Sequence, residues 1–173
     1  MKRSDINPLP EYFGRYIIQY KENTTILEAI QASIDELDAL PLDKWQALGS
    51  KVYAPNKWTI KDILQHLIDT ERIFGYRALA FARGDRQLLP PFSEDDYAAN
   101  TIANTRPFAD LIAELKLVHL STKALFQSFT VDMLNQKGIG FKGEYSVASI
   151  GFTLPGHQRW HFNIIEEKYL PLL

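Results

Sequence analysis

Hydrophobic residues recur with a helical period in four parts of the chain, and no part shows sustained strand-like alternation. Amphipathic helices bury apolar stripes of this kind most economically against one another. The sequence therefore predicts an all-α fold, a four-helix bundle, with helices over about residues 24–40, 59–83, 107–126 and 146–170.

The starts of these helices carry capping signals. Asn23 or Thr24 can cap the first helix, and Thr59 with Asp62 forms the capping-box pattern that satisfies free backbone N–H groups at the start of the second. Pro107 suits the first position of the third helix, because its fixed backbone angle matches helical geometry.

The connections between the helices differ in length. Residues 84–106 show little periodicity, which is typical of a crossover or a functional loop, and a crossover would let the second and third helices run parallel. The aromatic-rich residues 8–20 are expected to pack along the bundle. Gly138, Gly140 and Gly143 spell G-x-G-x-x-G, but without a strand–turn–helix context they indicate a turn before the fourth helix rather than a nucleotide site.

Composition limits the chemistry that the chain can perform. A length of 173 residues suits one domain, over residues 1–173, with a sizeable core. The net charge of −2 gives no electrostatic footprint for nucleic acid or an anionic membrane, and no apolar run is long enough to span a bilayer. The absence of cysteine excludes disulfides, thiolate metal sites and a cysteine nucleophile. We expect a cytoplasmic protein whose chemistry rests on imidazole, carboxylate and hydroxyl groups.

Histidine placement is the main indication of that chemistry. His157 and His161 are spaced i,i+4, so both project from one face of the predicted fourth helix. Two neutral imidazoles at this spacing can chelate one metal ion, or they can simply help to pack the helix. Pro155 lies just before them and should either kink the helix, because proline has no N–H to donate, or mark a late helix start.

His66 lies off the polar face of the predicted second helix, so it could complete a three-nitrogen site with His157 and His161. Three protein ligands with an open position are typical of a catalytic metal site rather than a structural one. Taken alone, His66 could equally be a histidine at the core boundary that hydrogen-bonds a carbonyl group.

Two further polar residues fall on apolar helix faces. His119 is the fourth histidine, and a lone histidine in that position is more often a satisfied core residue than a metal ligand. Glu71 could act as a general base or orient a metal ligand, or it could pair with Arg77. The sequence leaves these alternatives open.

Two stretches of the chain resemble the DinB-like (damage-inducible, YfiT-type) superfamily. They are PNKWTIKDILQHLIDTERIFGYRALAFARGD, residues 55–85, and GHQRWHFNIIEEKYL, residues 156–170. The resemblance extends over most of the chain and implies a four-helix bundle with a long crossover between helices two and three. It further implies one divalent metal ion per chain, zinc or nickel, held by His66, His157 and His161. Homodimers are frequent in the family.

One position departs from the family pattern. Relatives often carry a histidine immediately before the last ligand, where this chain has Trp160. The indole could narrow the site or form a stacking wall for a substrate, or it could pack against the second or third helix. The three ligand positions that the resemblance implies are intact.

The resemblance implies an enzyme acting on a small-molecule substrate. Family members are metal-dependent hydrolases or transferases of low-molecular-weight cellular thiols, and both reactions use a metal ion to activate water or a thiol. The alternative is a metal-binding bundle that serves as a sensor or interaction module without turnover. Fold and ligands do not fix the substrate.

Overall fold

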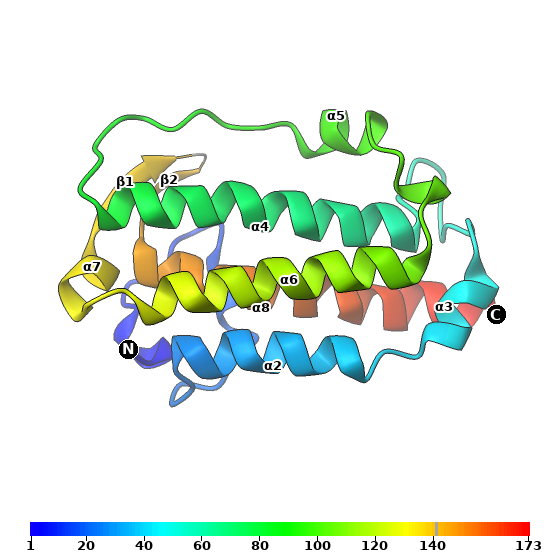
Figure 1. The fold of residues 1–173 in the computed structure, drawn as a ribbon, viewed down its shortest axis with the longest axis horizontal. Coiled ribbons are helices and arrows are strands. Elements are labelled where there is room, and N and C mark those ends of the chain that lie inside the picture. The colour runs from blue at the N-terminus through cyan, green and yellow to red at the C-terminus, as the bar shows by residue number, and fades with distance from the viewer. Residues whose placement is uncertain (141) are drawn as a thin grey trace.

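The computed structural model describes residues 1–140 and 142–173. Its four long helices are α2 (Ile26–Asp38), α4 (Ile60–Ala82), α6 (Phe108–Gln127) and α8 (Val147–Ile164). Helices α4 and α6 run in one direction, and α2 and α8 run in the other (Figure 1). Helices α2 and α4 each pack against both α6 and α8. The predicted four-helix bundle is confirmed, with its second and third long helices parallel.

Shorter elements join and flank the bundle. They are η1 (Arg3–Asp5), α1 (Gly14–Ile17), α3 (Leu42–Leu48), α5 (Glu94–Ala99), η2 (Ala103–Thr105), α7 (Val131–Asn135), β1 (Lys137–Gly140), β2 (Gly143–Ser146), the π-helical turn η3 (Ile165–Tyr169) and η4 (Leu170–Leu172).

Local capping explains where the long helices begin. Thr25, rather than Asn23 or Thr24, caps α2, because Glu28 three residues later accepts a hydrogen bond from the Thr25 backbone N–H at 2.7 Å. The predicted capping box of Thr59 and Asp62 is present at α4.

The fourth long helix, α8, begins well before Pro155 and contains this proline. Ser146 caps it by accepting a hydrogen bond from the Ser149 N–H at 3.0 Å, and the helix continues through Pro155 to Ile164. The alternative of a late start at Pro155 is therefore wrong. Pro155 leaves the Gly151 carbonyl without its helical N–H donor.

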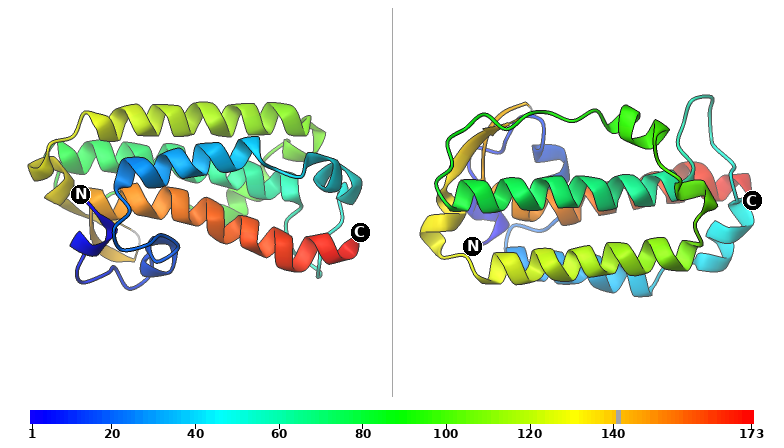
Figure 2. Two further views of the ribbon diagram at one scale, coloured as in Figure 1. Left: turned by 90° about the horizontal axis from the view of Figure 1, so that it is seen from below. Right: turned by 45° about the horizontal axis from the view of Figure 1, so that its top comes forward.

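The crossover between α4 and α6 is less irregular than its sequence suggests. It arches over the outer side of α4 and includes α5, which contacts α4 (Figure 2). Ser93 caps α5 by accepting a hydrogen bond from the Asp96 N–H at 3.2 Å. The S-x-x-D pattern was the sequence signal for this short helix, although its hydrophobic period is too brief to show.

A β-hairpin precedes α8 where the sequence predicted only a turn. Strands β1 and β2 pair antiparallel, with Gly138 opposite Tyr145. A Cβ atom at Gly138 would lie 2.0 Å from the Phe81 ring, so close packing on α4 explains this glycine. Strands of four residues are too short for alternation to reveal them.

The aromatic N-terminal segment packs along the bundle as predicted, with α1 against α8. The contact is close, because a Cβ atom at Gly156 would lie 2.0 Å from the Tyr16 carbonyl oxygen. Gly156 therefore allows Tyr16 to approach the helix one residue before His157.

Two apolar clusters fill the bundle, one at each end. Between them lies a band of buried polar side chains that we call the polar layer: Ser33, His66, Thr70, Glu71, His119, Thr122, His157 and Gln158. Buried polar groups are costly unless they are satisfied, so this layer is where function is expected.

Candidate metal centre

The polar layer holds three histidines whose Nε2 atoms converge. His66 comes from α4, and His157 and His161 come from successive turns of α8. The Nε2 of His157 lies 3.2 Å from that of His66 and 3.0 Å from that of His161. One ligand atom from each of the three residues lies within 4.8 Å of the others. The structure thus brings together all three histidines that the sequence singled out.

These distances fit a shared cation. A four-coordinate zinc ion with Zn–N distances of about 2.0–2.1 Å places its nitrogens roughly 3.3 Å apart. Protons alone serve this arrangement poorly, because the Nε2 of a neutral imidazole either donates one hydrogen bond or accepts one. The Nε2 of His157 has two nitrogen neighbours at hydrogen-bonding distance. A metal ion accepts all three lone pairs at once.

The surroundings keep these imidazoles neutral. Burial, with a smaller contribution from His161, lowers the pKa of His66 to about 3. Burial lowers the pKa of His161 to about 4 and that of His157 well below its usual range. Since metal ligands must be deprotonated, low pKa values favour ligation.

Polar and aromatic neighbours fix the orientation of the rings. The Thr70 hydroxyl lies 3.4 Å from the Nδ1 of His66, one helical turn away, so Thr70 touches the site. The Trp58 ring is 4.7 Å from the His66 ring, and the Tyr16 ring is 4.9 Å from the His157 ring. Burial and the neighbouring Tyr12 raise the pKa of Tyr16 to about 12, so its hydroxyl keeps its proton.

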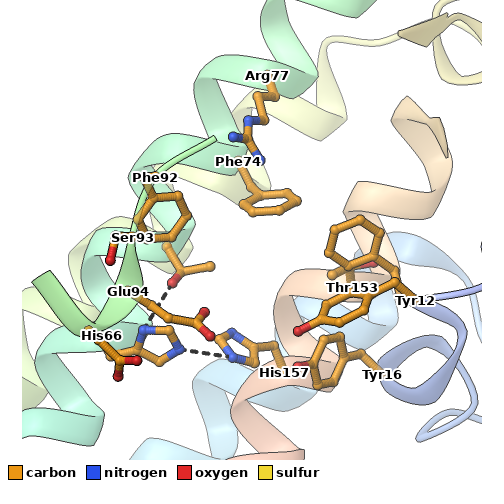
Figure 3. A pocket seen from close by; sticks show the side chains of 13 residues that line it. Tyr12, Tyr16, His66, Phe74, Arg77, Phe92, Ser93, Glu94, Thr153 and His157 are labelled. Carbon is orange, nitrogen blue, oxygen red and sulfur yellow. Dashed lines mark hydrogen bonds between the residues drawn. The ribbon is translucent and has the colours of Figure 1, made fainter. Parts of the chain in front are cut away.

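A cavity of about 260 Å³ opens on His66 and His157. It runs along one side of α4 and under the crossover. Figure 3 shows the two histidines at one end, with Glu94 beside them and Arg77 at the opposite end. The walls of the cavity are mostly aromatic, formed by Tyr12, Phe13, Tyr16, Phe74 and Phe92.

A second cavity, of about 230 Å³, is lined in part by His161. Glu94 and Asp95 of α5 line both cavities. Burial and the neighbouring Asp95 raise the pKa of Glu94, although Lys142 opposes the shift. The crossover therefore brings two carboxylates to the mouth of the histidine site.

His119 belongs to a different group in the polar layer. Its Nδ1 lies 2.6 Å from a Glu71 carboxylate oxygen, and its Nε2 lies 2.6 Å from Oε1 of Gln158. Of the alternatives that the sequence left open for Glu71, pairing with Arg77 is wrong, since α4 turns Glu71 toward His119 of α6. Arg77 instead donates to the Pro90 carbonyl oxygen at 2.9 Å.

The hydrogen-bond partners of His119 favour its protonated form. The Gln158 amide nitrogen donates to the Ser33 carbonyl and to Glu36, which leaves Oε1 of Gln158 as an acceptor for the His119 ring. Both ring nitrogens of His119 are therefore donors. Burial alone would lower the pKa of His119, but Glu71 and Gln158 outweigh it and raise that pKa.

Trp160 takes a role that the sequence did not suggest. Its ring packs edge-on against Tyr16 of the N-terminal segment, with the ring centroids 5.8 Å apart. Trp160 does not line the aromatic cavity. Glu166 and Glu167 are exposed beyond the end of α8.

Sequence reasoning missed several residues around the histidines. Tyr16, Trp58, Glu94 and Asp95 come from segments outside the periodic helices, where no local pattern points toward a site. The concentration of aromatic residues in the N-terminal segment was the one available signal for Tyr16. The capping pattern at Ser93 could have placed Glu94 on a helix, but not beside His66.

Fold and site together define a class of protein: a four-helix bundle with a crossover between its parallel helices and three converging histidines. The chain belongs to the DinB superfamily, whose family model matches residues 25–165. No curated protein is significantly similar to the chain in sequence.

A solved structure with the same fold is that of YfiT from Bacillus subtilis. It is similar with a TM-score of 0.69 at 17% identity, over 85% of this chain and 83% of YfiT. YfiT is described as a probable metal-dependent hydrolase with an unusual four-helix bundle topology. At this identity the likeness shows the fold. Among the described residues, no helix has both the length and the apolar character needed to cross a membrane.

Proposed function

We propose that the protein is a metal-dependent enzyme that holds one divalent ion, zinc or nickel, at His66, His157 and His161. The observation that carries the proposal is the convergence of three neutral Nε2 atoms from two helices at the spacing of a metal coordination sphere. When bound there, such an ion supplies Lewis acidity, which activates water or a thiol near neutral pH.

The residues around the site support turnover rather than sensing. A cavity of about 260 Å³ gives a small molecule access to His66 and His157, and its aromatic walls exclude water from the molecule that enters. Thr70 orients the His66 ring, and Glu94 is placed to accept the proton that water or a thiol gives up. A bundle that only senses the metal ion itself needs no such cavity.

The reaction class stays within two candidates, hydrolysis of a small ester or amide and transfer of a low-molecular-weight thiol. Both need the same activated nucleophile, so the histidines alone do not separate them. The cytoplasmic location and the homodimer stay predictions, which rest on the sequence and the family resemblance.

Metal analysis of untagged protein tests the proposal. We expect about one zinc or nickel per chain in the wild type and less than a tenth of that in His157→Ala, because two remaining imidazoles hold the ion far more weakly. His119→Gln is the matched control, since it removes a buried histidine from the same layer and should keep the metal. Unchanged metal content in His157→Ala would show that the ligand assignment is wrong.

Activity is tested on the same preparations. A panel of esters, amides and cellular thiols should reveal turnover that disappears on chelation and returns when the metal is added back. Metal binding without any turnover across the panel would favour the sensor.

A further inference from the structure

Arg77 carries a buried positive charge that the proposed reaction does not use. Its side chain lies on α4 with only 2% of its surface exposed. The guanidinium donates to the Pro90 carbonyl at 2.9 Å and to the Tyr145 hydroxyl at 3.5 Å, and it sits 4.6 Å above the Phe74 ring. These partners are all neutral.

Buried guanidinium groups normally have an acidic partner, because an unpaired buried charge is costly. Arg3, Arg72, Arg106 and Arg159 all pair with carboxylates. Within residues 1–140 and 142–173, no carboxylate pairs with Arg77, although it is more deeply buried than any of them. The described residues therefore provide no carboxylate to neutralise the charge of Arg77.

Arg77 lines the same cavity as His66 and His157. Figure 3 shows its guanidinium turned toward the cavity, above the Phe74 ring and at the end away from the histidines. About three helical turns of α4, or roughly 16 Å of rise, separate Arg77 from His66. Thr70 and Phe74 lie between them on the same side of the helix.

The two ends of the cavity carry opposite charges. Figure 3 shows Glu94 at the histidine end and Arg77 at the far end, and Asp95 lines both this cavity and the one that reaches His161. An anionic group is repelled by the two carboxylates and attracted by the guanidinium, whose planar fork matches a carboxylate in two parallel hydrogen bonds. The aromatic walls between the two ends suit an apolar middle section.

We propose that the substrate is an elongated small molecule with a terminal carboxylate, which Arg77 binds while the reacting bond lies at His66 and His157. The two ends of such a molecule are separated by an apolar chain or ring system on the order of 10 Å long, because long side chains on a helix lean toward its N-terminus and shorten the span. This inference rests on the proposed function for the position of the reacting bond, but the anion site at Arg77 does not depend on a metal.

Binding to metal-free protein tests the anion site. The protein is dialysed against a chelator and then against chelator-free buffer, so that no metal ion can hold the probe. The probes are 5-phenylpentanoate and its primary amide, which differ in charge but hardly in shape, and calorimetry measures their affinities at pH 7.5. We expect the carboxylate to bind wild type at least tenfold more tightly than the amide.

Variants assign the preference to one residue. Arg77→Gln should make the two affinities equal, and Arg77→Lys should keep part of the difference because it keeps the charge. Arg72→Gln is the matched control, since Arg72 lies on the same helix outside the cavity and pairs with Glu114, and it should leave the preference unchanged. Equal binding of the two probes to wild type, or a preference that survives in Arg77→Gln, would overturn the inference.

A measurement on wild type keeps the test decisive if Arg77→Gln fails to fold. The nuclear magnetic resonance signal of the Arg77 Nε–H should shift on titration with the carboxylate and stay in place with the amide. No shift with either probe would overturn the anion site. If the protein binds one metal ion per chain but does not prefer the carboxylate probe, only this inference is refuted. If it prefers the carboxylate probe but binds no metal ion, only the proposed function is refuted.

Discussion

The two histidine groups of the polar layer use the same side chain in opposite ways. His66, His157 and His161 face one another without a carboxylate within hydrogen-bonding distance among the described residues, and burial lowers the pKa of each. His119 lies 2.6 Å from Glu71, and its pKa is raised. One group therefore presents neutral lone pairs, whereas the surroundings of His119 favour its protonated, cationic form.

The difference shows how one bundle can use some buried histidines as candidate metal ligands and another to hold its helices together. Neutral imidazoles with converging lone pairs need a cation from outside, so they suit a metal site. An imidazolium whose two N–H groups both have acceptors is satisfied within the protein, so His119 joins helices instead. Through Glu71, Gln158 and Ser33, its hydrogen bonds connect α4, α6, α8 and α2.

The largest expected effect comes from removing the partner of His119. Glu71→Ala leaves the imidazolium buried without its counter-charge, and loss of one member of a buried ion pair costs about 3–5 kcal/mol. We expect urea unfolding at pH 7 to show this loss of stability, while the folded variant still holds one metal per chain. Glu166→Ala removes an exposed carboxylate and should change stability by less than about 0.5 kcal/mol.

A double variant separates charge from packing at the same position. Glu71→Met combined with His119→Leu replaces both charges with apolar side chains, which need no partner, so it should recover most of the stability lost in Glu71→Ala. If Glu71→Ala proved as stable as wild type, or lost its metal while folded, the separation between the two groups would be refuted.

A smaller effect is expected in the pH dependence of stability. The folded pKa of His119 lies above its usual value of 6.5, so its stabilising contribution is complete below pH 6.5 and is lost as the pH rises through the folded pKa. Metal-free wild type should therefore lose more stability than metal-free Glu71→Gln between pH 6.5 and 8. The difference in slope cannot exceed about 1.4 kcal/mol per pH unit.

Urea unfolding at several pH values measures this slope. The three converging histidines are present in both proteins, so their contribution cancels in the comparison. Parallel stability curves for the two proteins would show that His119 does not carry the charge assigned to it.

The smallest effect is expected at the Thr70 hydroxyl, beside the proposed metal site. Thr70→Val keeps the shape of the side chain but removes the contact with Nδ1 of His66, which at 3.4 Å is a long hydrogen bond. We expect metal affinity to fall by about tenfold, the low end of the range for residues that orient metal ligands. Competition with a chromogenic chelator measures it, and an unchanged affinity would mean that Thr70 does not orient His66.

Much of the fold could be predicted because its signals are local. A period of 3.6 residues places the apolar stripes, and capping boxes fix the helix starts, as at Thr59 and Asp62. The same local geometry puts His157 and His161 on one face. The hairpin and α5 escaped prediction because elements of four to six residues carry too little periodicity.

The partners of the buried groups could not be predicted from local patterns. Glu71 lies five residues after His66 and six before Arg77 in the sequence, yet it bonds His119 on another helix. Trp160 lies on α8 between His157 and His161, yet it packs on Tyr16, which lies far away in the chain. Each outcome depends on how the helices are rotated and spaced, which no single helix determines.

The sequence by itself determined the four helices, the pairing of His157 with His161 on one of them, and the inward side of His66. Only the tertiary structure decided that three Nε2 atoms meet within reach of one ion, that His119 is held apart by Glu71, and that Arg77 faces the same cavity without an acid. The physical reason is that the sequence patterns are local, whereas the contacts of the site join residues far apart in the chain. Backbone geometry fixes directions within a helix, whereas distances between side chains on different helices depend on how the whole bundle packs.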